Sequence, residues 1–264
     1  MTGRDFEEAL TRTRDRRGPF GAPLYYFDET RSTNDEAARL ADAGATEGTT
    51  VVASAQTAGR GRLGRSWFSP PDAGLYVSVI VRDRRAAPLL TLAAGVAIAD
   101  GIRSAIALPV EIKWPNDIVI DGGLGQRRKL AGILTEGSSG ADGLQYVVLG
   151  FGINVLAGTY PPDIADRVTS LSAELGRSVD APMLLAECLA AVAERVAQLT
   201  RGHTKAVLDR WRELSPSSTG ARIEFDGMDR RIRGITSGIA DDGALLVRVG
   251  DRVEPIRSGQ VSWL

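Results

Sequence analysis

Short strand-like runs joined by short turns are the feature that most constrains the fold of this chain of 264 residues. Runs rich in β-branched and apolar residues recur along its first half, and most connections between them carry no helical pattern. The runs are Pro23–Phe27, Thr49–Ala55, Leu75–Val81, Pro109–Ile112, Ile118–Asp121, Lys129–Glu136 and Leu144–Val155. Strands connected in this way favour a mixed or antiparallel sheet over an alternating strand–helix fold.

Helical apolar spacing appears at Leu89–Ala107 and returns only near Ala181–Arg201 and Thr204–Leu214. Together with the strand-like runs, these segments predict an α+β catalytic domain over residues 21–214. Residues 1–20 are charged and rich in arginine, without a convincing apolar period, so we expect a loose N-terminal segment there.

A small C-terminal domain is expected over residues 217–264. Ser215–Gly220 has the composition of a linker. Short strands parted by glycine turns follow it, at Arg222–Phe225, Arg231–Thr236, Ala244–Arg248 and Arg252–Ile256. The tripeptide Asp241-Asp242-Gly243 is typical of a hairpin turn. This pattern predicts a small SH3-like β-barrel that acts as a structural cap or a docking element.

The segment Gly59–Trp67 carries three glycines and three arginines between two strand-like runs. Glycine lets the backbone approach a bound anion closely, and guanidinium groups bind carboxylate and phosphate in a bidentate way. A solvated loop or a nucleic-acid patch is the simpler interpretation of such a run. The flanking strands favour a ligand-binding loop held at both ends.

The global composition argues against several classes of function. The chain has 32 basic and 33 acidic residues, so it lacks the basic field that nucleic-acid binding requires. Its one cysteine, Cys188, excludes an intrachain disulfide, and its one histidine, His203, excludes a multi-histidine metal site. We expect no membrane-spanning segment and no signal peptide, and therefore a cytoplasmic protein.

Two of the three lysines in the chain fall within motifs of mixed charge. Lys113-Trp114-Pro115-Asn116-Asp117 places a cation and a carboxylate around a turn. Lys129 begins an otherwise apolar strand, so its charge is expected to point into a ligand pocket. Ser32-Thr33-Asn34 precedes a helical stretch as an ordinary N-cap, although the same groups could bind a small polar ligand.

Taken together, these motifs resemble the signature of biotin protein ligases, which activate biotin with ATP and attach it to a lysine of a carrier domain. The resemblance covers about residues 25–264. Its motifs occur in the family's order: Ser32–Asn34, Gln56, Gly59–Trp67, Lys113–Asp117, Lys129–Glu136, Gly150–Val155, Thr169–Leu171 and the β-rich tail. It implies a biotin/lipoate ligase-type catalytic domain with ATP and Mg²⁺ as cofactors and biotin as substrate. The partner implied is the biotin carboxyl-carrier domain of a biotin-dependent carboxylase.

The resemblance also implies roles for individual residues. The implied catalytic residues are Lys129, Arg62, Lys113 and Asp117, and Asp117 is also the candidate metal ligand. The implied biotin-binding residues are Ser32, Thr33, Asn34, Gln56, Gly59, Arg60, Gly61, Arg62, Lys129, Gly132 and Leu134. The implied ATP-binding residues are Arg65, Trp67, Lys113, Asn116 and Asn154.

Three departures from the family pattern stand out. Only 31 residues precede Ser32, too few for a winged helix-turn-helix, so we expect no DNA binding. Gly122–Arg128 is longer and richer in glycine than in compact members, with an unknown effect on carrier docking. The chain ends Ser262-Trp263-Leu264 where some relatives place a nucleotide-binding arginine. Lipoate or octanoate attachment and a non-catalytic nucleic-acid module stay open as alternatives.

Overall fold

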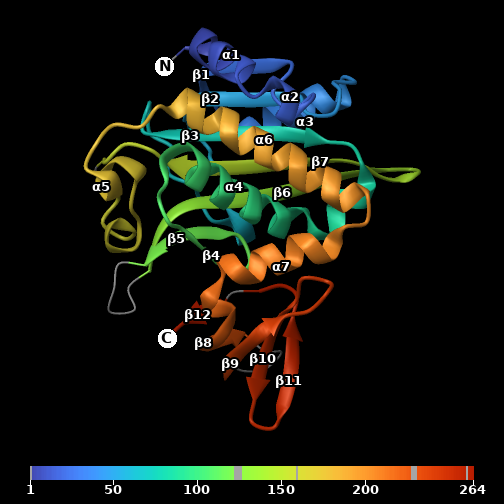
Figure 1. The fold of residues 1–264 in the computed structure, drawn as a ribbon, viewed down its shortest axis with the longest axis vertical. Helices are drawn as coiled ribbons and strands as arrows, with labels where there is room; N and C mark the ends of the chain where they lie inside the picture. The colour runs from blue at the N-terminus through green and yellow to red at the C-terminus, as the bar shows by residue number, and fades with distance from the viewer. Residues whose placement is uncertain (1, 122–126, 159, 227–230, 260) are drawn as a thin grey trace.

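The computed structural model describes residues 2–121, 127–158, 160–226, 231–259 and 261–264 (Figure 1). A seven-stranded sheet forms the centre of the larger part of the molecule, and a five-stranded sheet lies at its C-terminal end. The large sheet contains β1 (Leu24–Thr30), β2 (Thr50–Gln56), β3 (Gly74–Val81), β4 (Glu111–Lys113), β5 (Asp117–Asp121), β6 (Arg127–Gly140) and β7 (Gly143–Asn154). These strands match the strand-like runs of the sequence, with ends displaced by a few residues.

The strand order is β1-β2-β3-β7-β6-β5-β4. Only β1 and β2 pair in parallel, and helix α3 (Thr33–Asp42) connects them. The other neighbours pair antiparallel, and short connections join β4 to β5 and β6 to β7. The prediction of an α+β domain built on a mixed sheet is therefore confirmed.

Helices cover one face of this sheet, where α4 (Leu90–Ile106) packs against β5 and β6 and α6 (Ala181–Thr200) crosses over α4 (Figure 1). Two further helices are α7 (Thr204–Leu214), which was predicted, and the short α5 (Leu171–Leu175), which the sequence pattern missed. Cys188 of α6 is fully buried against α4, and burial raises the pKa of its thiol. It is therefore a structural residue, as its position in an apolar helix suggests.

The opposite face of the sheet holds the functional groups. Side chains alternate along β7, so that Leu149, Phe151 and Ile153 join the core while Gly150 and Gly152 face the other way. Helix α3 covers only one end of that second face, where Ala37 packs near Tyr146. The remainder of the face is left for a cavity.

One segment passes a test of length and apolar composition for a membrane span. Arg84–Ile106 is long and apolar enough to cross a bilayer, by length and composition alone. In the structure 67% of that apolar window is buried inside the fold. The segment comprises a 3-10 helix (Arg84–Leu89) followed by α4, which explains its apolar character as core packing.

The N-terminal segment is not loose, contrary to expectation. It forms α1 (Gly3–Thr11) and α2 (Arg14–Arg17), which pack on α6. Phe6 and Leu10 are buried, and the guanidinium of Arg17 donates hydrogen bonds to the carbonyl oxygens of Leu10 and Phe20. The apolar stripe is only three residues long, and the surrounding charges hide its helical spacing.

The presumed linker is also part of the packed structure. Ser215, Ser217 and Ser218 are buried around a 3-10 turn (Pro216–Ser218), and the first strand of the small sheet starts at Thr219. The hydroxyl of Thr236 donates to the carbonyl oxygen of Ser217 at 2.9 Å. A linker-like composition here belongs to a tight joint, because its backbone accepts internal hydrogen bonds, including one from the hydroxyl of Ser218 to the carbonyl oxygen of Ser215.

The small sheet has the order β11-β10-β9-β8-β12. Its strands are β8 (Thr219–Asp226), β9 (Arg231–Ile239), β10 (Leu245–Val249), β11 (Arg252–Ile256) and β12 (Val261–Trp263). Among the described residues no ladder joins β11 to β12, so we describe the SH3-like unit as an antiparallel sheet and not as a closed barrel. The predicted turn at Asp241-Asp242-Gly243 does join β9 to β10, with Gly243 at a φ of 83°.

We expect Leu10→Ala to lower the free energy of unfolding by roughly 2–5 kcal/mol, because it removes a buried side chain and leaves a cavity beside α6. Glu7→Ala, an exposed change on the same helix, should stay within about 0.5 kcal/mol of the parent. Urea denaturation of both variants measures the difference. Equal stability of the two would show that α1 contributes no packing.

Candidate active site

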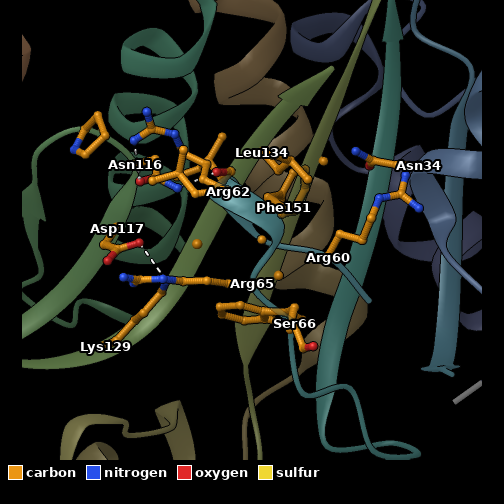
Figure 2. A pocket seen from close by; sticks show the side chains of 18 of the residues that line it. Asn34, Arg60, Arg62, Arg65, Ser66, Asn116, Asp117, Lys129, Leu134 and Phe151 are labelled. Carbon is orange, nitrogen blue, oxygen red and sulfur yellow. Dashed lines mark hydrogen bonds and ion pairs between the residues drawn. The ribbon is translucent and has the colours of Figure 1, made fainter. Parts of the chain in front are cut away.

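A cavity of about 210 Å³ lies between the second face of the large sheet and the arginine loop, defined here as Gly59–Trp67 (Figure 2). Residues from segments far apart along the chain line it. Most belong to the predicted set: Ser32, Thr33, Asn34, Gln56, Arg60, Gly61, Arg62, Arg65, Trp67, Lys113, Asn116, Asp117, Lys129, Gly132 and Leu134. The structure thus brings the separate sequence motifs together in one place.

Glycines of β6 and β7 form the floor of the cavity. Gly132 and Gly152 are register partners, and the indole of Trp67 lies against both. A Cβ atom on Gly152 would lie 2.4 Å from Nε1 of Trp67, and one on Gly132 would lie 3.0 Å from its ring. Gly150 makes the same room for Asn34, whose Oδ1 would lie 2.3 Å from an added Cβ. The floor must therefore be glycine for the ring and the amide to reach their positions.

The arginine loop folds back on itself over this floor. Gly61 N donates to the carbonyl oxygen of Arg65 at 2.6 Å, and Trp67 N donates to that of Gly59 at 2.9 Å. At the tip, Leu63 has a φ of 57° and is 66% exposed. An exposed leucine in the left-handed region has no packing role that explains it, which fits a loop shaped for a ligand.

One end of the cavity is cationic. Lys129 Nζ lies 2.7 Å from Asp117 Oδ1 and 5.1 Å from the centroid of the Trp67 ring (Figure 2). Lys113 sits on β4, opposite Asp117 in the strand register, and burial lowers the pKa of its ammonium. The pair of lysines around one carboxylate leaves a net positive charge facing the cavity.

Two arginines of the loop, Arg62 and Arg65, add to this charge. Burial lowers the pKa of the Arg62 guanidinium, whose Nη1 lies 3.5 Å from Oδ1 of Asn116. Asn116 is itself fixed, since its Nδ2 donates to the carbonyl oxygen of Ile133 at 2.7 Å. Asp117 is the one acidic residue among the described cavity lining, against five lysines and arginines. This end is therefore suited to a polyanion.

The other end carries neutral polar groups from the start of α3. Ser32 occupies the N-cap position without a side-chain cap hydrogen bond, so the ordinary capping role does not use its hydroxyl. Thr33 donates its backbone N–H to Gln56 Oε1 at 2.8 Å, and Gln56 Nε2 donates to Ser69 Oγ at 3.0 Å. A compact ligand with both donors and acceptors fits such a surface.

Arg60 lies at this polar end, next to Asn34 and away from Lys129 (Figure 2). Its guanidinium donates two hydrogen bonds to Asp35, at 2.7 and 2.9 Å, and one to Glu136 at 3.1 Å. The hydrogen bond from Arg60 lowers the pKa of the Asp35 carboxyl. Sequence reasoning missed both acidic partners, because neither stands in a motif that pairs it with an arginine.

Two predicted site residues do not line the cavity. Gly59 is buried, and a Cβ on it would meet the carbonyl oxygen of Trp67 at 2.6 Å. Asn154 is buried and donates from Nδ2 to the carbonyl oxygen of Thr169 at 2.9 Å. Both shape the surroundings of the site, and neither faces the cavity in this structure.

The cavity also includes residues to which the sequence analysis gave no individual role: Leu63, Ser66, Val77, Trp114, Pro115, Ile133, Gly150, Phe151, Gly152, Gly259 and Val261. Val261 belongs to β12 of the small C-terminal sheet, Gly259 lies between β11 and β12, and the ring of Trp263 lies 5.7 Å from Lys113 Nζ. The run Gly150-Phe151-Gly152 was visible as a motif, because alternate glycines on a strand leave one face bare. The predicted importance of Gly122–Arg128 concerns residues of which only Arg127 and Arg128 are described.

Comparison with known proteins agrees with this geometry. Residues 26–154 match the Biotin/lipoate A/B protein ligase family, and residues 220–263 match the biotin protein ligase C terminal domain. Among solved structures, a biotin protein ligase from Aquifex aeolicus in complex with biotin and ATP superposes with a TM-score of 0.78 at 28% identity. That similarity covers 91% of this chain and 98% of the Aquifex chain.

Two curated relatives extend the comparison along most of the chain. The bifunctional ligase/repressor BirA of Bacillus subtilis is 36% identical over 247 residues, covering 91% of this chain and 74% of BirA. The biotin--[acetyl-CoA-carboxylase] ligase of Mycobacterium tuberculosis is 35% identical over 246 residues, covering 89% of this chain and 87% of the relative. With the glycine floor, the arginine loop and both domains in place, the chain belongs to the biotin protein ligase family.

Proposed function

We propose that this protein activates biotin with ATP to form biotinyl-5'-AMP and then transfers biotin to a lysine of a carboxylase carrier domain. One observation carries the proposal: a single cavity has a neutral polar end at α3 and a cationic end around Lys113 and Lys129. Biotin has a neutral ureido ring at one end and a carboxylate at the other. The two ends of the cavity therefore match the two ends of the substrate.

In the first step a biotin carboxylate oxygen attacks the α-phosphorus of ATP. A new O–P bond forms while the bond to the bridging oxygen breaks, and pyrophosphate leaves. The barrier is dominated by bringing one anion against another, so positioned cations are the main requirement. We assign Lys129 and Arg62 to the carboxylate and α-phosphate, and Lys113, Arg65 and Asn116 to the nucleotide.

In the second step the amine of a carrier lysine attacks the acyl carbon of the adenylate. The new C–N bond replaces the C–O bond to AMP, and the amine proton must be taken up. Asp117, which holds Lys129 at 2.7 Å, is the carboxylate of the described lining that could orient the amine and accept that proton.

The site suits magnesium that arrives with the nucleotide. The described residues contain no group of three or more His, Cys, Asp or Glu that could hold a metal ion. Mg²⁺ commonly binds through one or two carboxylates together with substrate phosphates, and Asp117 could supply one such contact. The metal would neutralise charge on the phosphates, while the residues of the loop and β6 hold the reacting groups.

Pyrophosphate release on adding biotin and ATP tests the proposal directly, with lipoate and ATP as the comparison. We expect release with biotin and a rate at least about tenfold lower with lipoate, because lipoate has no ureido ring for the polar end. Release with lipoate alone would assign the protein to lipoate attachment.

We further propose that the enzyme acts in the cytoplasm and does not bind DNA. A gel-shift assay can check the absence of DNA binding.

Lys129→Ala should reduce adenylate formation by roughly two to three orders of magnitude, because it removes one preorganised charge beside the reacting carboxylate. Its melting temperature should stay within a few degrees of the parent, since the side chain lies at the cavity edge and not in the core. Pyrophosphate release and thermal unfolding measure the two effects.

Lys205→Ala is the matched control, because Lys205 is exposed and pairs only with Asp209 on the surface of α7. It should behave like the parent protein. If both lysine variants release pyrophosphate at the parent rate, the assigned role of Lys129 is wrong.

Arg62→Gly should release the adenylate prematurely, because the guanidinium reaches over the cavity from the loop and contacts Asn116. Free biotinyl-5'-AMP acylates exposed lysines, so bystander proteins such as serum albumin should become labelled. A streptavidin blot measures the labelling. Arg177→Gly, an exposed loop arginine outside the cavity, is the control, and equal labelling by the two variants contradicts a clamping role.

Gly152→Ala should lower adenylate formation by about a hundredfold, because the added methyl group displaces Trp67 and with it the arginine loop. Gly137→Ala lies on the neighbouring strand outside the cavity and meets only a flexible leucine methyl at 3.0 Å. It should keep nearly full activity. Similar rates for both variants in the pyrophosphate assay would show that the glycine floor does not set the position of the loop.

A further inference from the structure

Glu136 lies just outside the described cavity lining, yet it joins three elements that form the polar end. It extends from β6 and accepts hydrogen bonds from Asn34 Nδ2 of α3 at 2.5 Å and from Arg60 Nη2 of the arginine loop at 3.1 Å. Arg60 in turn binds Asp35 of α3. The roles assigned so far to the site do not use this carboxylate.

The contacts of Asn34 determine which way its amide points. A carboxylate paired with arginine only accepts hydrogen bonds, so the NH₂ group of Asn34 must face Glu136. The amide oxygen Oδ1 then faces Ser78 Oγ at 2.5 Å. Since an amide oxygen can only accept, the hydroxyl proton of fully buried Ser78 is committed to Asn34.

The fixed direction of donation at Ser78 also determines what Thr33 can do. Ser78 Oγ lies 2.8 Å from Thr33 Oγ1 and has no second proton to donate. The hydroxyl of Thr33 must therefore donate, either to Ser78 Oγ or to Gln56 Oε1 at 3.1 Å. In both arrangements the single proton of Thr33 is used within the protein. Thr33 lines the cavity, so toward a ligand its hydroxyl oxygen can act only as an acceptor.

We propose that Glu136 is a positioning residue that orders the hydrogen bonds of Asn34, Ser78 and Thr33, so that Thr33 accepts a hydrogen bond from a ligand N–H. The Glu136 carboxylate sets the direction of these hydrogen bonds, because it stands at one end of the series and can only accept. This inference rests on the proposed function, in which the ligand group is a ring N–H of biotin. Through Arg60, the same carboxylate ties the base of the arginine loop to that recognition surface.

The test compares Glu136→Gln and Ser78→Ala with the parent protein. The glutamine side chain of Glu136→Gln can donate as well as accept, so it no longer holds the Asn34 amide in one orientation. Ser78→Ala removes the hydroxyl that links Asn34 to Thr33. Each variant should raise KM for biotin about tenfold while kcat and KM for ATP change less than about twofold. KM for biotin in the double variant should be no more than about twofold above that of the more strongly affected single variant, because both substitutions break the same series of hydrogen bonds.

Two biotin analogues, in each of which one ring N–H is replaced by oxygen, separate hydrogen-bond ordering from simple anchoring of the loop. The parent should prefer biotin over one analogue by about tenfold or more in kcat/KM. That preference should fall to about twofold in both variants. Once the hydrogen bonds of Asn34, Ser78 and Thr33 have no fixed direction, the site no longer requires a donor from the ligand. Loss of loop anchoring alone would weaken biotin and analogue equally.

Glu187→Gln is the control variant. Glu187 also accepts from an arginine, Arg16 at 2.6 Å, and from a serine, Ser104 at 3.0 Å, but it lies on α6 away from the cavity. It should leave KM and analogue preference unchanged. Thermal unfolding checks each variant, and Ser78→Ala decides the question if Glu136→Gln does not fold.

The outcomes are distinct. A parent protein that releases no pyrophosphate with biotin would show that the proposed function has failed. An active parent with no preference for biotin over either analogue, or variants that keep the full preference, would overturn the ordering by Glu136 while leaving the function intact.

Discussion

Packing of the Trp67 ring on the bare glycine face of β6 and β7 is the contact on which the site depends. Because Gly132 and Gly152 lack side chains, the ring lies directly on the sheet and holds one end of the arginine loop there. The same ring faces Lys129, so the loop and β6 share one surface. Without this bare face, the arginines would stand above the sheet and could not enclose a ligand.

The cavity separates two kinds of chemistry along its length. Cations gather around Asp117 at one end, where burial also lowers the pKa of Lys113. Arg60 would extend the positive charge to the other end, but Asp35 and Glu136 neutralise it there. A polyanion is therefore attracted to the lysine end, and the α3 end is left for neutral donors and acceptors. This division, more than the total charge, orients a substrate with one charged end.

Much of the fold was predictable because strands and long helices have a strong apolar period. The runs that became β2, β3, β6 and β7, and the helices α4, α6 and α7, lie within a few residues of the predicted ranges. The failures share a cause. The α1 helix and the Ser215–Ser218 joint look polar, and they are ordered only because distant partners bury Phe6 and bind the serine backbone.

The sequence by itself determined which residues form the candidate site, since reactive lysines, loop arginines and strand glycines stand in compact motifs. Only the tertiary structure decided which partners these residues contact and which of them face the cavity. It turned Arg60 toward two carboxylates, left Asn154 beneath the cavity lining and carried the C-terminal strand with Val261 to the site. The physical reason is that pairing between residues such as Asn34 and Glu136, far apart along the chain, depends on strand register and helix placement, which local patterns do not encode.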